Sequence, residues 1–259
     1  MKIVGIVQAR MSSTRLPGKV LLDVLGRPLI LLMLERVSRC RLLDELWLAT
    51  SVQAEDDPLA EAVQGAGYRV FRGSLEDVLS RFRVIGKETS ADVLVRLTGD
   101  CPLHDPEVVD AVVDCFLKAG QGVNYVSNVL PPTYPDGLDV EVFRFSALER
   151  AYLEAESDFD REHVTPPIRK AAGREGRMAN CFGPADFSHL RWTLDEPEDY
   201  ELIRRIFEEM YPQKGNFGWL DVLAWQTRLP ERLAINAMHG RNEGATRKKA
   251  LPGAAGGGM

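Results

Sequence analysis

Cysteine, histidine and long apolar runs are scarce in this chain of 259 residues, and each scarcity excludes a class of protein. The four cysteines form no C-x-x-C pair, so we expect reduced thiols rather than a disulfide framework. The four histidines show no H-x-x-x-H spacing, which argues against zinc. No apolar stretch is long enough to cross a bilayer, and MKIVGIVQARM reaches polar residues too early for a signal peptide. We therefore expect a cytoplasmic protein without a membrane partner.

Basic charge is not in excess either. The chain has 38 acidic and 32 basic residues, for a formal net charge of -6. This balance argues against nucleic acid or an anionic membrane as the main partner, so any site for an anion must be local. With 45% hydrophobic and 27% charged residues, the composition is that of one large globular domain with a sizeable core.

Short apolar runs alternate with amphipathic segments through the first half of the chain. We expect strands at residues 2–8, 45–50, 68–71 and 92–98. Helices are expected at residues 28–40 and 57–67, from Leu75 onward, and from Pro106 onward with Asp105 as the cap. Strands that alternate with helices predict an α/β fold with a mostly parallel sheet covered on both faces.

The pattern changes after Asn124, where strands at residues 138–143 and 189–194 are expected to flank a helical stretch at 146–155. This change indicates a mixed-sheet edge or a small lobe at about residues 130–190. Pro197 begins a last strong helix, and residues 218–228 are expected to add another. From residue 240 the chain lacks apolar periodicity, which predicts a domain at residues 1–239 and a disordered tail at 240–259.

Anion-binding side chains are concentrated directly after the first strand, in the first loop, residues 8–19 (QARMSSTRLPGK). Three cations, three hydroxyls and a glycine can together cradle a triphosphate at the carboxyl end of a strand. The loop is not a Walker A motif, because Gly18-Lys19 is followed by Val20 and Ser13 stands where glycine is required. A different phosphate-binding fold is needed.

The string VQARMSSTRLPGKVLLDVLGRPLI resembles the N-terminal signature of the cytidylyltransferases that make CMP-activated acidic sugars. That family includes 3-deoxy-manno-octulosonate and acylneuraminate cytidylyltransferases, and its branch of spore coat polysaccharide biosynthesis proteins resembles this chain from Lys2 to about Tyr211. The resemblance implies a Rossmann-like, GT-A-like nucleotidyltransferase fold with an acceptor and dimerisation lobe. It also implies CTP as a substrate, Mg²⁺ as the cofactor and a homodimer. The nucleotide-binding residues would be Gln8, Ala9, Arg10, Ser12, Ser13, Thr14, Arg15, Lys19 and Thr98.

Two acidic motifs follow strands. T-G-D-C-P-L closes the strand at residues 92–98, so Asp100 should emerge at the same sheet edge as the first loop. In the family the Asp of the matching G-D-x-P motif binds a metal, which implies that Asp100 holds Mg²⁺. L-R-W-T-L-D-E-P-E-D resembles the second acidic motif and implies that Asp195 is the second metal ligand. Glu198 and Asp199 are better explained as first-turn acids that complement the helix dipole.

An acceptor side is suggested by two further segments. Y-P-D-G-L-D-V-E-V-F places Asp139 and Glu141 on one face of a strand, although the same alternation fits an ordinary half-exposed strand. It resembles the spore-coat branch, as does R-E-H-V-T-P, so the acceptor candidates are Asp139, Glu141, Arg161, Glu162 and His163. The octulosonate enzymes carry an acidic residue in place of Cys101 and a proline in place of Gln8, which leaves the acceptor open.

We therefore expect a Mg²⁺-dependent enzyme that transfers CMP from CTP to a small acidic acceptor and releases pyrophosphate. Its catalytic residues would be Arg10, Arg15, Lys19 and Asp100. One alternative is a glycosyltransferase that uses a finished nucleotide sugar, although no D-x-D follows a strand in the central region. The other is a protein that binds nucleotide without turnover.

Overall fold

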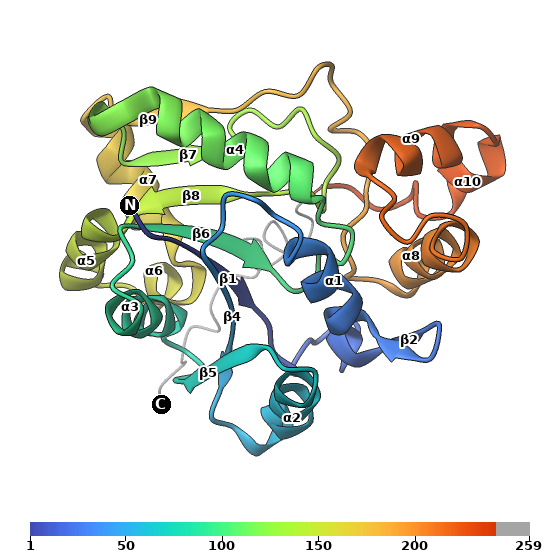
Figure 1. Cartoon of the computed structure of the whole chain (residues 1–259), viewed down its shortest axis with the longest axis horizontal. Helices are drawn as coiled ribbons and strands as arrows, with labels where there is room; N and C mark the ends of the chain where they lie inside the picture. Colours follow the sequence, from blue (N-terminus) through green and yellow to red (C-terminus); the bar gives the residue numbers. More distant parts are fainter. Residues whose placement is uncertain (242–259) are drawn as a thin grey trace, which may run out of the picture.

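The described residues, 1–241 of a computed structural model, contain a seven-stranded sheet with the order β5-β4-β1-β6-β8-β7-β9 (Figure 1). Its strands are β1 (Ile3–Gln8), β4 (Glu45–Ser51), β5 (Arg69–Gly73), β6 (Val93–Thr98), β7 (Tyr125–Ser127), β8 (Glu141–Arg144) and β9 (Met178–Asn180). A separate two-stranded ribbon joins β2 (Asp23–Val24) to β3 (Arg27–Pro28). β1, β4, β5 and β6 are mutually parallel, whereas β8 is antiparallel to β6 and β7, and β9 is parallel to β7.

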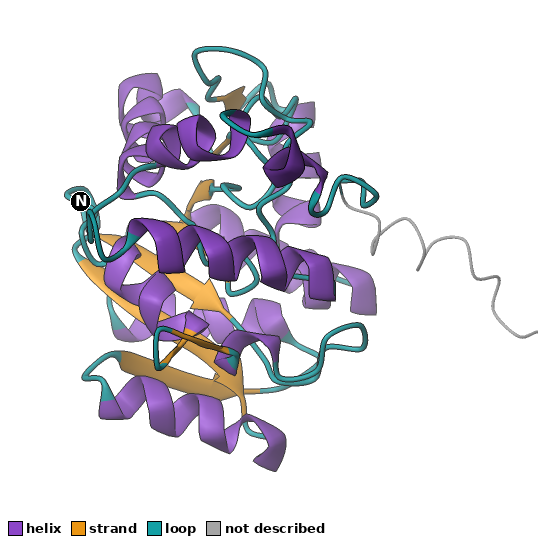
Figure 2. Ribbon diagram, turned by 90° about the vertical axis from the view of Figure 1, so that its right-hand side faces the viewer, coloured by secondary structure: helices purple, strands orange, loops and turns teal. Residues whose placement is uncertain are grey.

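Helices lie on both faces of this sheet, as Figure 2 shows from the side. They are α1 (Leu29–Val37), α2 (Asp57–Gly65), α3 (Val78–Glu88), α4 (Pro106–Ala119), α5 (Phe145–Glu154), α6 (Asp158–His163), α7 (Thr165–Arg174), α8 (Pro197–Met210), α9 (Trp219–Thr227) and α10 (Pro230–Ala234). Short 3₁₀ turns are η1 (Lys19–Leu21), η2 (Ala54–Asp56) and η3 (Gly120–Gly122). The predicted α/β fold, with a mostly parallel sheet between helices, is confirmed.

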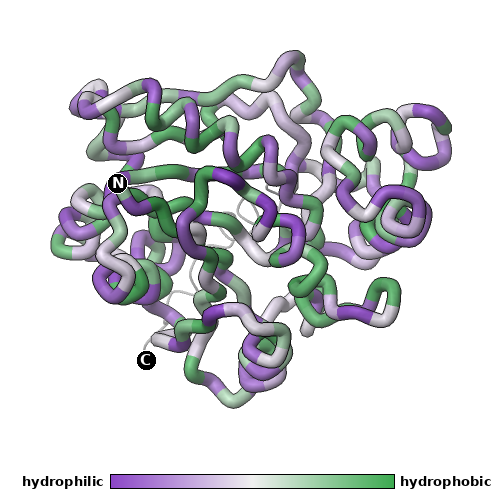
Figure 3. Tube along the Cα trace, in the orientation of Figure 1, coloured by the Kyte–Doolittle hydropathy of each residue, from purple (hydrophilic) through white to green (hydrophobic). Residues whose placement is uncertain are grey.

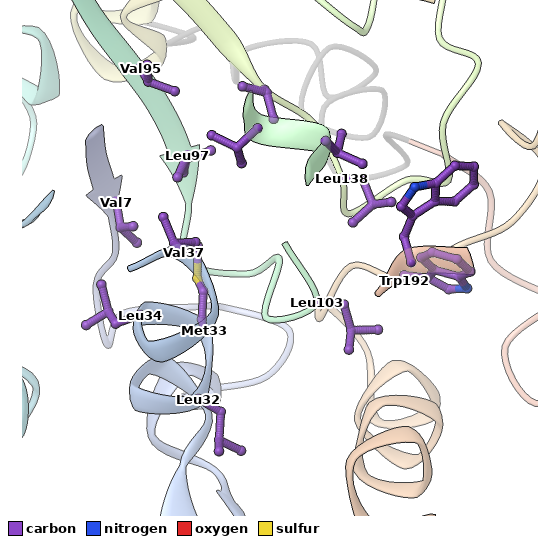
Figure 4. Close-up of a cluster of buried hydrophobic side chains, with 14 of the residues drawn as sticks. Val7, Leu32, Met33, Leu34, Val37, Val95, Leu97, Leu103, Leu138 and Trp192 are labelled. Atoms are coloured by element: carbon purple, nitrogen blue, oxygen red, sulfur yellow. The ribbon is translucent and has the colours of Figure 1, made fainter. Parts of the chain in front are cut away.

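The sheet lies between two hydrophobic cores. Successive side chains of a strand point to opposite faces, so one strand contributes to both cores. On β1, Val7 belongs to the core built with α1, α2, α4 and α8, whereas Ile6 belongs to the core built with α3, α5 and α7. Figure 4 shows Val7 and Leu97 beside Val37 of α1. Figure 3 shows hydrophobic colouring along the central strands and more hydrophilic colouring on the outer turns of the helices. Each such buried aliphatic side chain stabilises the fold by about 1.5–3 kcal/mol relative to exposure.

One strand prediction was wrong, and the strand expected at residues 138–143 is present but begins later, as β8 at Glu141. Residues 189–194 form no strand, and the only ladder contact there is an isolated bridge between Asp136 and Arg191. Asp139 precedes β8 instead of lying within it. The reason is Asn128, whose side-chain amide donates to the carbonyl of Leu138 and accepts from the amide of Val140, and so replaces a neighbouring strand.

The helix expected from Leu75 begins at Val78 instead. Asp77 ends the preceding loop and its carboxylate accepts a hydrogen bond from the amide of Ser80, which defines it as the N-cap. No helix among residues 1–241 combines the length and apolar character needed to span a membrane. Most of the predicted tail lies outside the described residues. Gly240 and Arg241 are described, and they bond to Arg191 and to the carbonyl of Tyr134, respectively.

Candidate active site

The first loop leaves β1 at Gln8 and folds back on itself through the backbone of Met11. The carbonyl of Met11 accepts hydrogen bonds from the amides of Ser13 (2.8 Å) and Gly18 (3.1 Å). Gly18 has a φ of 69°, in the left-handed region that glycine adopts without strain, and it leads directly into η1. This turn directs Lys19, the first residue of η1, into the protein, where only 8% of its surface is exposed.

Lys19 brings together the two carboxylates predicted to hold a metal. Its Nζ donates to Oδ1 of Asp195 at 2.8 Å and lies 3.3 Å from Oδ2 of Asp100. It also donates to the carbonyl of Leu194 at 2.8 Å. Asp100 follows β6 and Asp195 precedes α8, so the site joins the first loop to two distant segments at the carboxyl edge of the parallel strands.

The segment that carries Asp195 is fixed from two sides. The amide of Leu194 donates to the carbonyl of Asp100 at 2.7 Å. On the other side, Asp199 accepts hydrogen bonds from the amides of Asp195 and Glu196, both at 3.0 Å. Two guanidinium nitrogens of Arg191 donate to the two carboxylate oxygens of the buried Asp199, at 2.9 and 2.8 Å. Asp199 therefore positions the segment that carries Asp195 as well as the start of α8.

Carboxylates from other elements pair with the remaining cations of the first loop. Arg15 lies 2.9 Å from both Asp195 and Glu196. Arg10 lies 3.2 Å from Glu162 of α6. All three predicted phosphate-binding cations thus already face anionic oxygens, and phosphate oxygens are chemically similar partners for them.

Electrostatics keeps Asp100 and Lys19 charged at neutral pH. Burial alone would raise the pKa of Asp100, but the Lys19 ammonium and the hydrogen bond from Thr98 lower it to about 2. Burial would lower the pKa of Lys19, yet Asp100 and Asp195 raise it. Next to them, burial and the charge of Asp100 raise the pKa of the Cys101 thiol well above its ordinary value, so Cys101 is not a thiolate nucleophile.

The donor set suits a magnesium ion shared with a nucleotide. Among residues 1–241 no three His, Cys, Asp or Glu side chains are grouped so that protein alone could cage a metal. Asp100 and Asp195 supply only carboxylate oxygens and already surround a cation, the Lys19 ammonium. Mg²⁺ is typically held by one or two carboxylates together with phosphates and water, and these two residues fit that requirement.

Among the acceptor candidates, Asp139 lies within electrostatic reach of Asp100. Burial, and after it the charges of Glu141 and Asp100, raise the pKa of Asp139, whereas Arg241 acts in the opposite direction. The carboxylate of Asp139 is ion-paired with Arg241. Asp139 is thus joined to the end of the described chain.

Glu141 is buried, and Arg96 and Tyr125 are among its partners. It forms an ion pair with Arg96 and accepts a hydrogen bond from the hydroxyl of Tyr125 at 2.6 Å. The Nε of Arg96 donates in turn to Oε1 of Gln8 at 2.8 Å. Gln8 and Glu141 are therefore linked across the sheet through an arginine that our sequence reasoning missed, although a charge inside the apolar run DVLVRLT is a detectable signal.

Of the three candidates on α6, only Glu162 reaches the first loop. Arg161 lies 2.9 Å from Asp77 at the start of α3. The ring of His163 packs at a tilt against that of Phe159, on the same helix, with centroids 4.3 Å apart. The contact of Arg161 is therefore with α3, whereas that of His163 lies within α6.

The other loop candidates have mixed positions. Ser12 and Thr14 are exposed, and the Ser13 hydroxyl accepts a hydrogen bond from the amide of Leu16 at 3.5 Å. Ala9 is buried against Gly99, where an added Cβ would lie 2.6 Å from the Ala9 Cβ. This close approach brings the backbones after β1 and β6 together.

Asp136 is a further carboxylate that sequence reasoning missed. It is buried, and burial followed by the charge of Asp139 raises its pKa to about 7, although Arg191 and Arg241 act in the opposite direction. Arg191 and Glu196 were also missed, although both lie inside the motif LRWTLDEPED. The site thus combines several acids with the arginines and the one lysine that pair with them.

Comparisons with known proteins confirm the resemblance. The sequence model of the cytidylyltransferase family matches residues 4–218. An uncharacterised protein of Methanocaldococcus jannaschii, MJ1063, is 44% identical over 213 residues, which cover 80% of this chain and 83% of that protein. The spore coat polysaccharide biosynthesis protein SpsF of Bacillus subtilis is 36% identical over 214 residues, covering 80% and 87%. A solved cytidylyltransferase of Leptospira borgpetersenii superposes with a TM-score of 0.85 at 30% identity, covering 94% and 98%.

Proposed function

This chain belongs to the cytidylyltransferase family, and we propose that it transfers CMP from CTP to an acidic sugar or a related small acceptor in polysaccharide precursor synthesis. The observation that carries the proposal is the convergence of Arg15 and Lys19 of the first loop with Asp100 and Asp195. A triphosphate with its divalent ion needs both halves of this arrangement, the cations for its oxygens and the carboxylates for its metal.

In the proposed reaction an acceptor oxygen attacks the α-phosphorus of CTP. One P–O bond forms to the acceptor, the bond between the α-phosphorus and the bridging oxygen breaks, and pyrophosphate leaves with the electron pair. The proton of the acceptor hydroxyl passes to solvent or to a nearby carboxylate. Arg10, Arg15 and Lys19 hold the phosphate chain in line and neutralise charge on the leaving group. Mg²⁺ held by Asp100 and Asp195 would, when bound, neutralise further phosphate charge.

When CTP binds, its phosphates would have to replace the carboxylates that pair with Arg10 and Arg15. Glu162 would release Arg10, and Glu196 would release Arg15, as CTP enters. Arg15 would keep its pair with Asp195 during this exchange, and all four exchanging side chains are partly exposed, so water can reach them. Until then the ion pairs with Glu162 and Glu196 would hold Arg10 and Arg15 near the proposed phosphate site.

The acceptor is proposed to bind beside Asp139 and Glu162. Both side chains are partly exposed and belong to elements that contact the nucleotide-binding segments. Glu141, Arg161 and His163 stay in the proposed acceptor set as residues that shape the site around their present partners. We further propose that the enzyme works in the cytoplasm as a homodimer. A monomer mass at micromolar concentration in light scattering would contradict the dimer.

The decisive experiment incubates the protein with Mg²⁺, each of the four nucleoside triphosphates and a panel of acidic sugars, phosphosugars and phosphonates. Pyrophosphate and the coupled product are measured. We expect pyrophosphate only with CTP and an acidic acceptor. Release of a nucleoside diphosphate from a nucleotide sugar would instead indicate a glycosyltransferase, and CTP binding without any turnover would indicate a non-catalytic protein.

A further inference from the structure

A buried carboxylate that belongs to neither predicted acidic motif touches the first loop. Asp56 ends η2, directly after β4, and only 1% of its surface is exposed. Its Oδ1 accepts a hydrogen bond from the amide of Met11 at 2.7 Å. Its Oδ2 accepts from the amide and the hydroxyl of Ser51, at the end of β4.

The side chain of Asp56 points away from the helix that it precedes, α2. Asp56 occupies the N-cap position of α2, where an aspartate normally accepts hydrogen bonds from its own helix. Its side chain makes no such bond and instead bonds to Met11 and Ser51. A carboxylate so deeply buried is costly unless hydrogen bonds compensate, and here the compensating donors include the first loop.

Met11 is the residue through which the loop is closed. Its carbonyl accepts from the amides of Ser13 and Gly18, so a displacement of Met11 would move both ends of the turn. Arg10 precedes it and Arg15 lies within the turn. The bond from Asp56 therefore connects the end of β4 to the position of the phosphate-binding side chains.

Hydrogen bonds to β4 also hold the start of the first loop, next to this contact. The carbonyl of Ala49 on β4 accepts from the amide of Ala9 at 3.2 Å and from the guanidinium of the buried Arg81 at 3.2 Å. β4 is thus held against the start of the loop. The bond from the amide of Met11 to Asp56 holds the loop at a second residue, two positions after Ala9.

We propose that Asp56 is a positioning residue for the donor nucleotide, whose carboxylate preorganises the first loop through the amide of Met11. The inference rests on the proposed function, because the loop's ligand is taken to be CTP. Without the bond the loop would have to be ordered when the nucleotide binds, and that ordering lowers affinity.

The test compares Asp56→Ala with Asp110→Ala, because alanine leaves no side-chain acceptor, whereas an asparagine oxygen could still accept from Met11. Asp110 is a matched control, because it is also buried and accepts hydrogen bonds from the amides of Arg41 and Leu42, which precede β4 at the opposite edge of the sheet. CTP binding with Mg²⁺ is measured by calorimetry, without an acceptor. We expect Asp56→Ala to weaken CTP binding about tenfold and Asp110→Ala to change it less than about twofold.

Ser51→Ala supplies a second control, since it removes a bond to Asp56 and leaves the Met11 contact in place. It should lower stability without changing CTP affinity more than Asp110→Ala does. Hydrogen exchange on the wild-type chain needs no variant. The amide of Met11 should exchange more slowly than those of Ser12 and Thr14, and equal rates would overturn the inference even if Asp56→Ala does not fold.

The outcomes separate the two proposals. Equal CTP affinities for Asp56→Ala and Asp110→Ala would overturn the role of Asp56 and leave the proposed function standing. A wild-type protein that binds no CTP would overturn the proposed function. In that case slow exchange at Met11 would still support the anchoring of the loop by Asp56, and fast exchange would remove it.

Discussion

His104 lies in the loop between Asp100 and α4, and its imidazole is fully buried. Neither ring nitrogen has a hydrogen-bond partner among the described residues. Burial, the largest cause, lowers the pKa of His104 to about 3, with Asp100 acting against the shift and Arg36 adding to it. The fold therefore holds a neutral imidazole in an apolar place beneath the predicted metal-binding loop.

Replacing this imidazole should change both stability and its pH dependence. In His104→Leu two buried, unpaired polar atoms are removed, which we expect to stabilise the protein by about 1–3 kcal/mol at pH 7. At acid pH the free energy of unfolding of the wild-type protein should fall further. Its unfolded chain takes up a proton below an ordinary pKa of about 6.5, whereas the folded imidazole stays neutral until its pKa of about 3.

The sign follows from this difference in proton binding. Stability that depends on the neutral imidazole is fully present above the unfolded pKa and is lost as the pH falls toward 3. Between pH 7 and pH 5 the loss amounts to about 2 kcal/mol, because each pH unit below the unfolded pKa costs about 1.4 kcal/mol. The leucine variant lacks this loss, so its advantage over wild type should widen by the same amount.

Urea unfolding of both proteins at pH 7, 6 and 5 measures the effect. Other titrating groups are common to both chains and cancel in the difference. The control is His189→Leu, the same substitution at an exposed histidine, whose gap to wild type is measured at the same three pH values. If the gap for His104→Leu did not change with pH, the imidazole would have to titrate alike in folded and unfolded protein, and the reasoning would fail.

Three further predictions follow from the site. Asp100→Ala should lower pyrophosphate release with CTP by roughly 100-fold or more while the chain stays folded, since Lys19 keeps its other partners; wild-type turnover would remove Asp100 from the mechanism. Gly137→Ala should cost about 3 kcal/mol in denaturant unfolding, because φ is +110° and the new Cβ would lie 2.5 Å from backbone; an unchanged midpoint would contradict this. Arg241→Ala should raise the KM of the acceptor found in the panel, whereas Arg232→Ala, which breaks an ion pair of an arginine equally little exposed, should not; equal KM values would remove Arg241 from the acceptor side.

Local patterns in the sequence determined much of this architecture. The apolar runs that became β1, β4 and β6 are short and rich in branched side chains, and α4 carries a proline, a capping aspartate and an apolar stripe in succession. Such signals act over a few residues and need no partner to be recognised. The first loop and Asp100 were also predictable, because each directly follows one of these strands and ligands bind at strand ends.

Only the tertiary structure decided how the site is closed. Lys19 and Asp195 are 176 residues apart, and their contact depends on the extended segment at 189–194, whose bonds go to Asp100 and Asp136 instead of a strand. The same holds for Asp56, whose local pattern is that of a helix cap, and for Arg241, which lies in a stretch without periodicity. Their roles come from neighbours brought close by folding, and no short-range pattern encodes which distant backbone amide or carboxylate a side chain will meet.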